Sequence, residues 1–171
     1  DLDRIRLQVR PEDEEVLREQ MKSKYPFVRL LAYNLFRDYF KDEHYAVLIK
    51  EYKDSHDPHF KIPLIFQILA KFEKEDDIAE FLQYVKQHPD EYVNHNLQYF
   101  GGKRKIIKEV KSRLKKPDHY AKRFLYVYLL GLIGDESCIE DLEILSNDKE
   151  EIVRQEAINA IETIRAKKDH L

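Results

Sequence analysis

The feature that most constrains the fold of this chain is the regular recurrence of proline at the start of apolar segments. Intervals of 32, 31 and 28 residues separate Pro26, Pro58, Pro89 and Pro117, and a further 32 residues lead to Lys149. Proline is favoured in the first turn of a helix, because its missing N–H would be unpaired there and its φ is already helical. A helix is therefore predicted to begin near each of these five positions.

Each of the five predicted helices opens with the same two-residue signature, an apolar or small residue followed by a polar and mostly basic one. The five pairs are Val28-Arg29, Phe60-Lys61, Val93-Asn94, Ala121-Lys122 and Val153-Arg154. Because the signature recurs together with the prolines, it indicates an internal repeat of about 30 residues.

A second set of helical patterns lies between these starts. Apolar residues recur there at intervals of three and four, as in Ile139, Leu142 and Leu145, which is the spacing of one face of a helix. The helices of this set are predicted at Glu14 to Met21, Asp42 to Lys53, Asp76 to Gln87, Lys103 to Lys115 and Ser137 to Ser146. Both sets together make ten helices, which pair into five hairpins.

The composition agrees with a helix-rich chain, since 37% of the residues are charged and only four glycines and six prolines occur. A repeat of about 30 residues with two helices cannot bury its own apolar faces, so successive repeats are expected to stack around a continuous core. We therefore predict an all-α fold, an α-solenoid in a single domain over residues 1–171. Its repeats are expected at about residues 12–40, 41–73, 74–101, 102–133 and 134–169.

The segment from Leu132 to Ile164 resembles a HEAT-like repeat. It has the Gly-Asp turn, the small-plus-aliphatic pair, the Leu-rich first helix and the Val-Arg pair of that family, carried by Gly134-Asp135, Cys138-Ile139, Leu142 and Val153-Arg154. The resemblance implies a right-handed solenoid of antiparallel hairpins, with the second helix of each hairpin on the concave face. It also implies that the polar members of the five signature pairs contact acidic turn residues of adjacent repeats.

The enzymes of this family carry residues that the chain lacks. HEAT-like di-iron hydroxylases use repeated His-Glu pairs as metal ligands, and no His-Glu dipeptide occurs here. HEAT-like DNA glycosylases rely on tryptophan on a basic concave face, whereas this chain has no tryptophan and a net charge of −3. Phosphate-binding glycine loops and nucleophile elbows are also missing from the sequence. We therefore expect a non-enzymatic protein with no catalytic residue, no cofactor and no resident metal.

Two histidines share one predicted turn with two aspartates. The turn contains His56 and His59 beside Asp54 and Asp57, and such a group can hold a divalent ion. The alternative is a polar turn in which Asp57 is the N-cap of the helix that begins at Pro58. We favour the N-cap.

The segment from Lys103 to Arg123 is strongly basic, with ten Lys and Arg residues against Glu109 and Asp118. A buried stripe is predicted at Ile106, Ile107, Val110 and Leu114, which makes the outward positions cationic. Such a face attracts an acidic protein, a nucleic-acid backbone or anionic lipid; the alternative is an ordinary solvated helix face. The candidate binding residues are Lys103, Arg104, Lys105, Lys108, Lys111, Arg113 and Lys115.

The helix after Pro89 is short and ends at Gly101-Gly102, where glycine permits a bend. A change in solenoid curvature is predicted there. Its polar residues Asn94, His95 and Gln98 are candidates for a partner-facing notch, and simple divergence of the repeat is the alternative. Nearby aromatic residues are either stacking platforms for bases or core residues; they are Tyr92, Tyr99, Phe100 and Tyr120.

Two of the second helices are apolar on nearly every side, the one after Pro58 and the one after Pro117. Such a helix lies at the centre of the stack or lines an apolar groove. Phe66 and Tyr126 are the groove candidates, and burial in the core is the alternative.

The leading functional hypothesis is a scaffold that binds a protein or peptide on its concave face. The alternative is an anion-binding module for nucleic acid or an acidic membrane surface, using the basic helix 103–123. No apolar run is long enough to span a membrane, the first fifteen residues contain no signal-peptide core, and the single Cys138 cannot form an internal disulfide. We expect a soluble cytoplasmic protein or the soluble part of a longer, anchored one.

Overall fold

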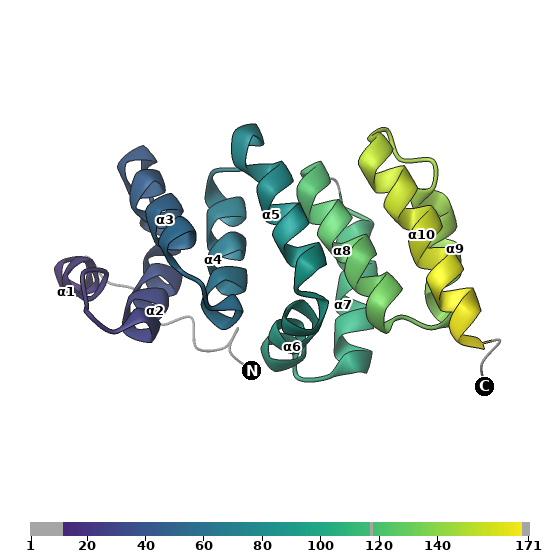
Figure 1. Cartoon of the computed structure of the whole chain (residues 1–171), viewed down its shortest axis with the longest axis horizontal. Coiled ribbons are helices and arrows are strands. Elements are labelled where there is room, and N and C mark those ends of the chain that lie inside the picture. Colours follow the sequence, from purple (N-terminus) through teal and green to yellow (C-terminus); the bar gives the residue numbers. More distant parts are fainter. Residues whose placement is uncertain (1–11, 117, 169–171) are drawn as a thin grey trace. The chain divides into compact units, whose positions relative to one another are not determined.

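The computed structural model describes residues 12–116 and 118–168, and within these ranges the chain is all-α. No strand occurs in the described ranges, which confirms the predicted fold class. The ten α-helices found there are α1 (Asp13–Gln20), α2 (Pro26–Phe36), α3 (Asp42–Asp54), α4 (Pro58–Lys71), α5 (Glu75–Gln87), α6 (Pro89–Phe100), α7 (Lys103–Leu114), α8 (Tyr120–Ile133), α9 (Ile139–Leu145) and α10 (Glu151–Lys168) (Figure 1). Two short 3₁₀ turns accompany them, η2 (Arg37–Tyr39) and η3 (Glu136–Cys138).

The helix starts follow the proline signal. Pro26, Pro58 and Pro89 each stand in the first turn of a helix, as predicted. Pro117 lies outside the described residues, and α8 begins three residues after it. The helix expected near Lys149 begins at Glu151. The helices of the second set start and end within one residue of the prediction, except that the last predicted one divides into η3 and α9.

The chain forms two compact units, Asp1–Phe81 and Leu82–Leu171, and the division falls within α5. In unit 1, α2 packs on α1 and α4, and α3 packs on α4. The core of this unit is rich in aromatic side chains, with Tyr33, Phe36 and Tyr52 almost completely buried. Tyr52 meets Phe81 edge to face, with 4.9 Å between the ring centroids.

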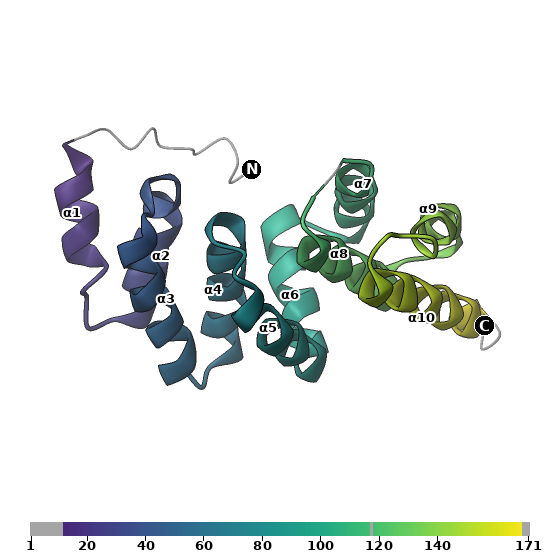
Figure 2. The same ribbon diagram turned by 90° about the horizontal axis from the view of Figure 1, so that it is seen from above.

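Unit 2 is built around α8, which contacts α6, α7 and α10. Figure 2 shows α7 and α9 on one side of this unit and α8 and α10 on the other. Gly131 of α8 permits the close approach of α10, since a Cβ at this position would lie 3.1 Å from the Cβ of Ala160. At the next turn, Gly134 leaves no room for a side chain, because its Cβ would lie 2.3 Å from the carbonyl oxygen of Leu130.

Two arginines in different units make the same contact with the turn before their helix. Nη1 of Arg29 donates to the carbonyl oxygen of Ser23 over 2.7 Å, and Nη1 of Arg154 donates to that of Asp148 over 2.7 Å. Each arginine also closes the first full turn of its helix through its backbone N–H. The N–H of Arg29 donates to the carbonyl oxygen of Tyr25, and that of Arg154 donates to the carbonyl oxygen of Glu150. The arginine of the Val-Arg pair therefore occupies the same position at the start of α2 in unit 1 and of α10 in unit 2.

The same backbone register corrects the signature pair of α8. Its first full turn runs from the N–H of Arg123 to the carbonyl of His119, so Arg123 and not Lys122 corresponds to Arg29 and Arg154. The register differs because α8 begins at Tyr120, three residues after Pro117, whereas α2 begins at Pro26 itself.

The glycine pair ends α6 as predicted. Gly101 is left-handed with φ 77° and caps the helix, its N–H donating to the carbonyl of Leu97. Gly102 has φ 130° and immediately precedes α7. Both conformations favour glycine strongly over residues with a Cβ. The two residues thus separate α6 from α7 with no further linker.

Candidate binding surfaces

An apolar stripe lies exposed on α2 in unit 1. Phe27 and Leu31 are four residues apart, so they share one side of the helix, and they are 64% and 60% exposed. This side lies opposite the buried Ala32, Tyr33 and Phe36. Large apolar side chains that adjoin one another on a surface are typical of a contact site for another molecule.

The predicted groove residue Phe66 lies on the neighbouring helix of the same unit. Nε2 of Gln67 on α4 donates to Oδ1 of Asn34 on α2 over 2.9 Å, which brings the turn of Phe66 next to the α2 stripe. Phe66 is half-buried, whereas the residues before and after it are buried. Phe66 is therefore a partly accessible ring one position away from the hydrogen bond that joins α4 to α2.

Tyr126, the other groove candidate, belongs to α8 in unit 2 and is half-buried. Its hydroxyl oxygen accepts a hydrogen bond from Nη1 of Arg113 on α7 over 3.1 Å. The phenol tip is thus tied to the first helix of its hairpin. Most of α8 is core, as expected of a helix that is apolar on nearly every side.

The polar residues of α6 divide between surface and interior. Asn94 and Gln98 are exposed, whereas Asn96 is buried and donates from its amide to the carbonyl of Tyr92 over 2.8 Å. His95 is half-buried, and burial lowers its pKa to about 4. It is therefore neutral at physiological pH, which leaves Asn94 and Gln98 as the open polar pair of the predicted notch.

The aromatic residues near the basic segment are mostly packed. Tyr92 is completely buried and donates from its hydroxyl to the carbonyl of Leu125 over 2.7 Å. Phe100 lies under the guanidinium of Arg113 at 5.2 Å, and Tyr120 is half-buried. Tyr99 is 42% exposed and is the only one of the four predicted aromatics that is open to solvent.

The basic residues of the segment 103–123 fall into two classes. Some are held in ion pairs, where Lys111 contacts Asp141 at 3.0 Å, Arg113 contacts Glu109 at 2.9 Å and Lys122 contacts Asp118 at 3.3 Å. The hydrogen bond to Asp141 raises the pKa of Lys111 above its ordinary value, against the opposing effect of burial. The others are exposed and have no ion pair within the described chain; they are Lys103, Arg104, Lys105, Lys108, Lys115 and Lys116.

The predicted buried stripe of this helix is largely correct. Ile106, Ile107 and Val110 are buried, as expected. Leu114 is only half-buried, because α7 ends at this residue.

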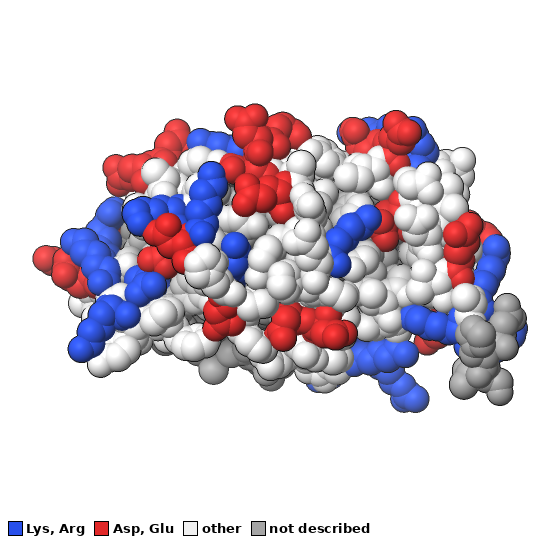
Figure 3. Space-filling model, viewed as in Figure 1, with Lys and Arg blue, Asp and Glu red and all other residues white. Residues whose placement is uncertain are grey.

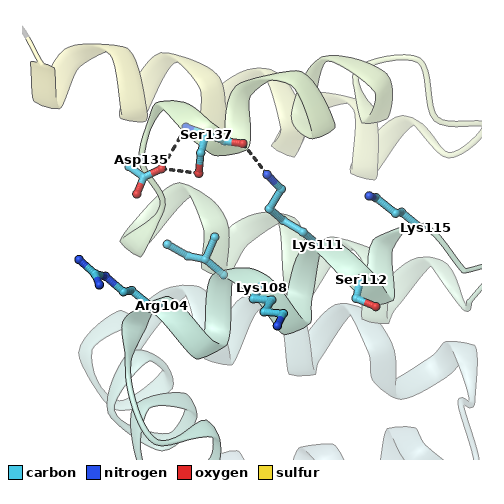
Figure 4. A pocket seen from close by; sticks show the side chains of 8 residues that line it. Arg104, Lys108, Lys111, Ser112, Lys115, Asp135 and Ser137 are labelled. Carbon is cyan, nitrogen blue, oxygen red and sulfur yellow. Dashed lines mark hydrogen bonds between the residues drawn. The ribbon is translucent and has the colours of Figure 1, made fainter.

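An open pocket of about 490 Å³ lies between α7 and the turn before α9 (Figure 4). Side chains of α7 form one wall, and Asp135 and Ser137 form the other. Nζ of Lys111 crosses between them and donates to the carbonyl oxygen of Ser137 over 2.6 Å. The α7 wall consists of Arg104, Ile107, Lys108, Lys111, Ser112 and Lys115.

The turn before α4 has the structure predicted for an N-cap. Oδ1 of Asp57 accepts a hydrogen bond from the backbone N–H of His59 over 3.0 Å. Among the residues that the structure describes, no group of three or more His, Cys, Asp or Glu side chains could hold a metal ion. The geometry of this turn is thus accounted for by helix capping.

Arg123 and Asp148 form an ion pair that the sequence did not reveal. The two side chains are almost completely buried, and Nε and Nη2 of Arg123 donate to the two carboxylate oxygens over 2.9 and 2.8 Å. Burial by itself raises the pKa of Asp148, but the hydrogen bonds from Arg123 and from the N–H of Glu150 outweigh it and lower the pKa. This ion pair joins α8 to the turn before α10, the kind of contact that the resemblance implied for Lys122.

The other signature residues behave differently from one another. Arg29 contacts Glu51 of α3 at 2.8 Å, which is again a pair between adjacent repeats. Lys61 lies over the ring of Tyr52 at 4.3 Å, and burial lowers its pKa. Arg154 contacts backbone carbonyls of its own turn. Contacts of the predicted kind are therefore present at Arg29 and Arg123, Lys61 also interacts electrostatically with Glu80 of α5, and Arg154 contacts its own turn instead.

The face shown in Figure 3 has mixed charge, with Lys and Arg near Asp and Glu. Uncharged side chains cover the middle of α10. Ile152 and Ile158 of α10 are 42% and 40% exposed.

Comparison of the chain with protein-family models, with curated proteins and with solved structures finds no match. None of the helices in the described ranges is both long enough and apolar enough to cross a membrane.

Proposed function

We propose that the chain is a non-enzymatic scaffold of HEAT-like repeats that binds a protein or peptide along its second helices. In this proposal the ten helices are five antiparallel hairpins of one right-handed α-solenoid, and α2, α4, α6, α8 and α10 line its concave face. Solenoids of this type offer broad and rigid surfaces that suit protein recognition.

The helix-to-helix contacts support the repeat. Second helices pack on second helices within each unit, α2 on α4 in unit 1 and α8 on α6 and α10 in unit 2. The matching contacts of Arg29 and Arg154 with their turns give the first and last hairpins the same local geometry.

The exposed stripe of α2 is the observation that carries the binding function. Phe27 and Leu31 leave large apolar surfaces in water on a helix whose other side is already buried in the core. Burial of apolar area stabilises by about 25 cal/mol per Å², so a partner that covers both side chains gains affinity from them. Apolar anchors spaced by one helical turn fit an extended or helical peptide with apolar side chains of its own.

Selection of random peptides on the immobilised chain tests this proposal. We expect enriched peptides to be rich in apolar residues and to lose affinity for Leu31→Glu by about tenfold or more, as for an interface anchor. Ile144→Glu is the matched control, because Ile144 is 69% exposed on α9 of the other unit. It should leave the affinity unchanged.

Two results would contradict the proposal. One is a selection that enriches no peptide. The other is a set of enriched peptides whose dissociation constants, measured by fluorescence anisotropy, are the same for wild type and Leu31→Glu.

The basic surface of α7 favours a second candidate, an anion-binding module. Six exposed cations on and beside this helix have no ion pair within the described chain, and three of them line the pocket in Figure 4. Unneutralised charge of one sign attracts an anionic partner and accelerates its association. Nucleic acid, an acidic membrane surface and an acidic protein are the partners to compare.

A further inference from the structure

Three unpaired cations follow one side of α7. Arg104, Lys108 and Lys115 all line the pocket and are exposed, and they are separated by four and seven residues. At 1.5 Å per residue, the row extends over about 17 Å along the helix. Lys111 lies within the same row, although Asp141 already holds it.

The opposite wall of the pocket is negative. Asp135 accepts hydrogen bonds from the hydroxyl and the backbone N–H of Ser137, and these bonds lower the pKa of its carboxyl group. The carboxylate is therefore charged at neutral pH.

This arrangement favours one class of anionic partner over the others. A nucleic-acid strand has a phosphate at every nucleotide, so phosphates along its length would approach Asp135 as well as the cations. A membrane surface gains little here, since Ile106, Ile107 and Val110 are buried and cannot enter lipid. A polypeptide can place carboxylates against α7 and neutral or basic groups against Asp135.

We propose that the pocket face of α7 binds an acidic protein segment with Asp or Glu side chains at helical spacing. Carboxylates at positions i, i+4 and i+11 of a helical segment match the positions of Arg104, Lys108 and Lys115. The inference rests on the anion-binding function and specifies its partner.

A designed peptide tests the inference on the whole chain. The probe is a labelled alanine-rich helix with glutamates in the i, i+4, i+11 pattern, and its control has glutamine at the same positions. Fluorescence anisotropy at low ionic strength should show binding of the glutamate peptide and none of the glutamine peptide. Lys108→Glu should weaken binding by about tenfold or more, because attraction becomes repulsion.

The matched control variant is Lys149→Glu. Lys149 is an exposed lysine in the same unit and lies outside the pocket, so its reversal should leave the affinity within about twofold. Equal losses for both variants would overturn the inference, since they would indicate only a response to net charge. Thermal unfolding of each variant verifies that the fold is intact.

Two further probes distinguish a wrong choice of partner class from a failure of the anion-binding function. Single-stranded DNA and vesicles of anionic lipid are titrated under the same conditions. If either binds through Lys108 while the peptide does not, the inference is wrong and the anion-binding function stands. If none of the three probes binds at low salt, both are wrong.

Discussion

The roles of single residues in this chain are set either by neighbours within a few positions or by a partner in another turn. The N-cap of Asp57 and the left-handed Gly101 follow from neighbours within a few positions. The sequence pattern points to Lys122 rather than to Arg123, because the role of Arg123 depends on its contact with Asp148, 25 residues further along the chain. The backbone hydrogen bonds identify Arg123 instead. At the start of their helices Arg29, Arg123 and Arg154 each donate the backbone N–H to the carbonyl oxygen four residues earlier.

The ion pair between Arg123 and Asp148 is expected to be a major contributor to stability. Arg123→Met leaves a buried carboxylate without its partner, which costs about 3–5 kcal/mol in the free energy of unfolding. Lys122→Met is the matched control, because the contact of Lys122 with Asp118 is partly exposed and such pairs contribute about 1 kcal/mol or less. Urea unfolding monitored by circular dichroism measures both. Equal losses of unfolding free energy in the two variants would show that the ion pair of Arg123 contributes no more to stability than that of Lys122.

The boundaries of helices were predicted more accurately than the faces that they bury. Proline at a first turn and the spacing of apolar residues are local signals, and they located α3 and α7 to within one residue. Which side of a helix is covered depends on its neighbours. Phe27 and Leu31 lie in an apolar segment that reads as core, yet they remain exposed because α1 and α4 cover other sides of α2.

The junction between α6 and α7 depends on the backbone conformation of Gly101. An alanine at φ 77° is strained, so we expect Gly101→Ala to lower the free energy of unfolding by about 1 kcal/mol. Asparagine tolerates the left-handed region better than alanine does, and Gly101→Asn should therefore be the less destabilising change. Thermal unfolding in the same buffer compares the two. A larger loss for asparagine would indicate that side-chain crowding, rather than backbone strain, decides this position.

At the scale of the whole molecule, the internal repeat leads to one all-α fold but leaves two distinct surfaces as binding candidates. The apolar stripe of α2 belongs to unit 1, and the basic face of α7 belongs to unit 2. The basic face was visible in the sequence, because charge clusters along a helix can be counted. The pocket beside it was not, since it requires Asp135 and Ser137 from the turn before α9.

The most direct test of the proposed function is the location of a bound peptide on the chain. Backbone amide signals of the labelled protein are followed by NMR while a selected apolar peptide is added. The largest shifts should map to the exposed stripe of α2 and to the turn of α4 that contains Phe66. Shifts confined to α7 and α9, or shifts that are identical in wild type and Leu31→Glu, would contradict binding along the second helices.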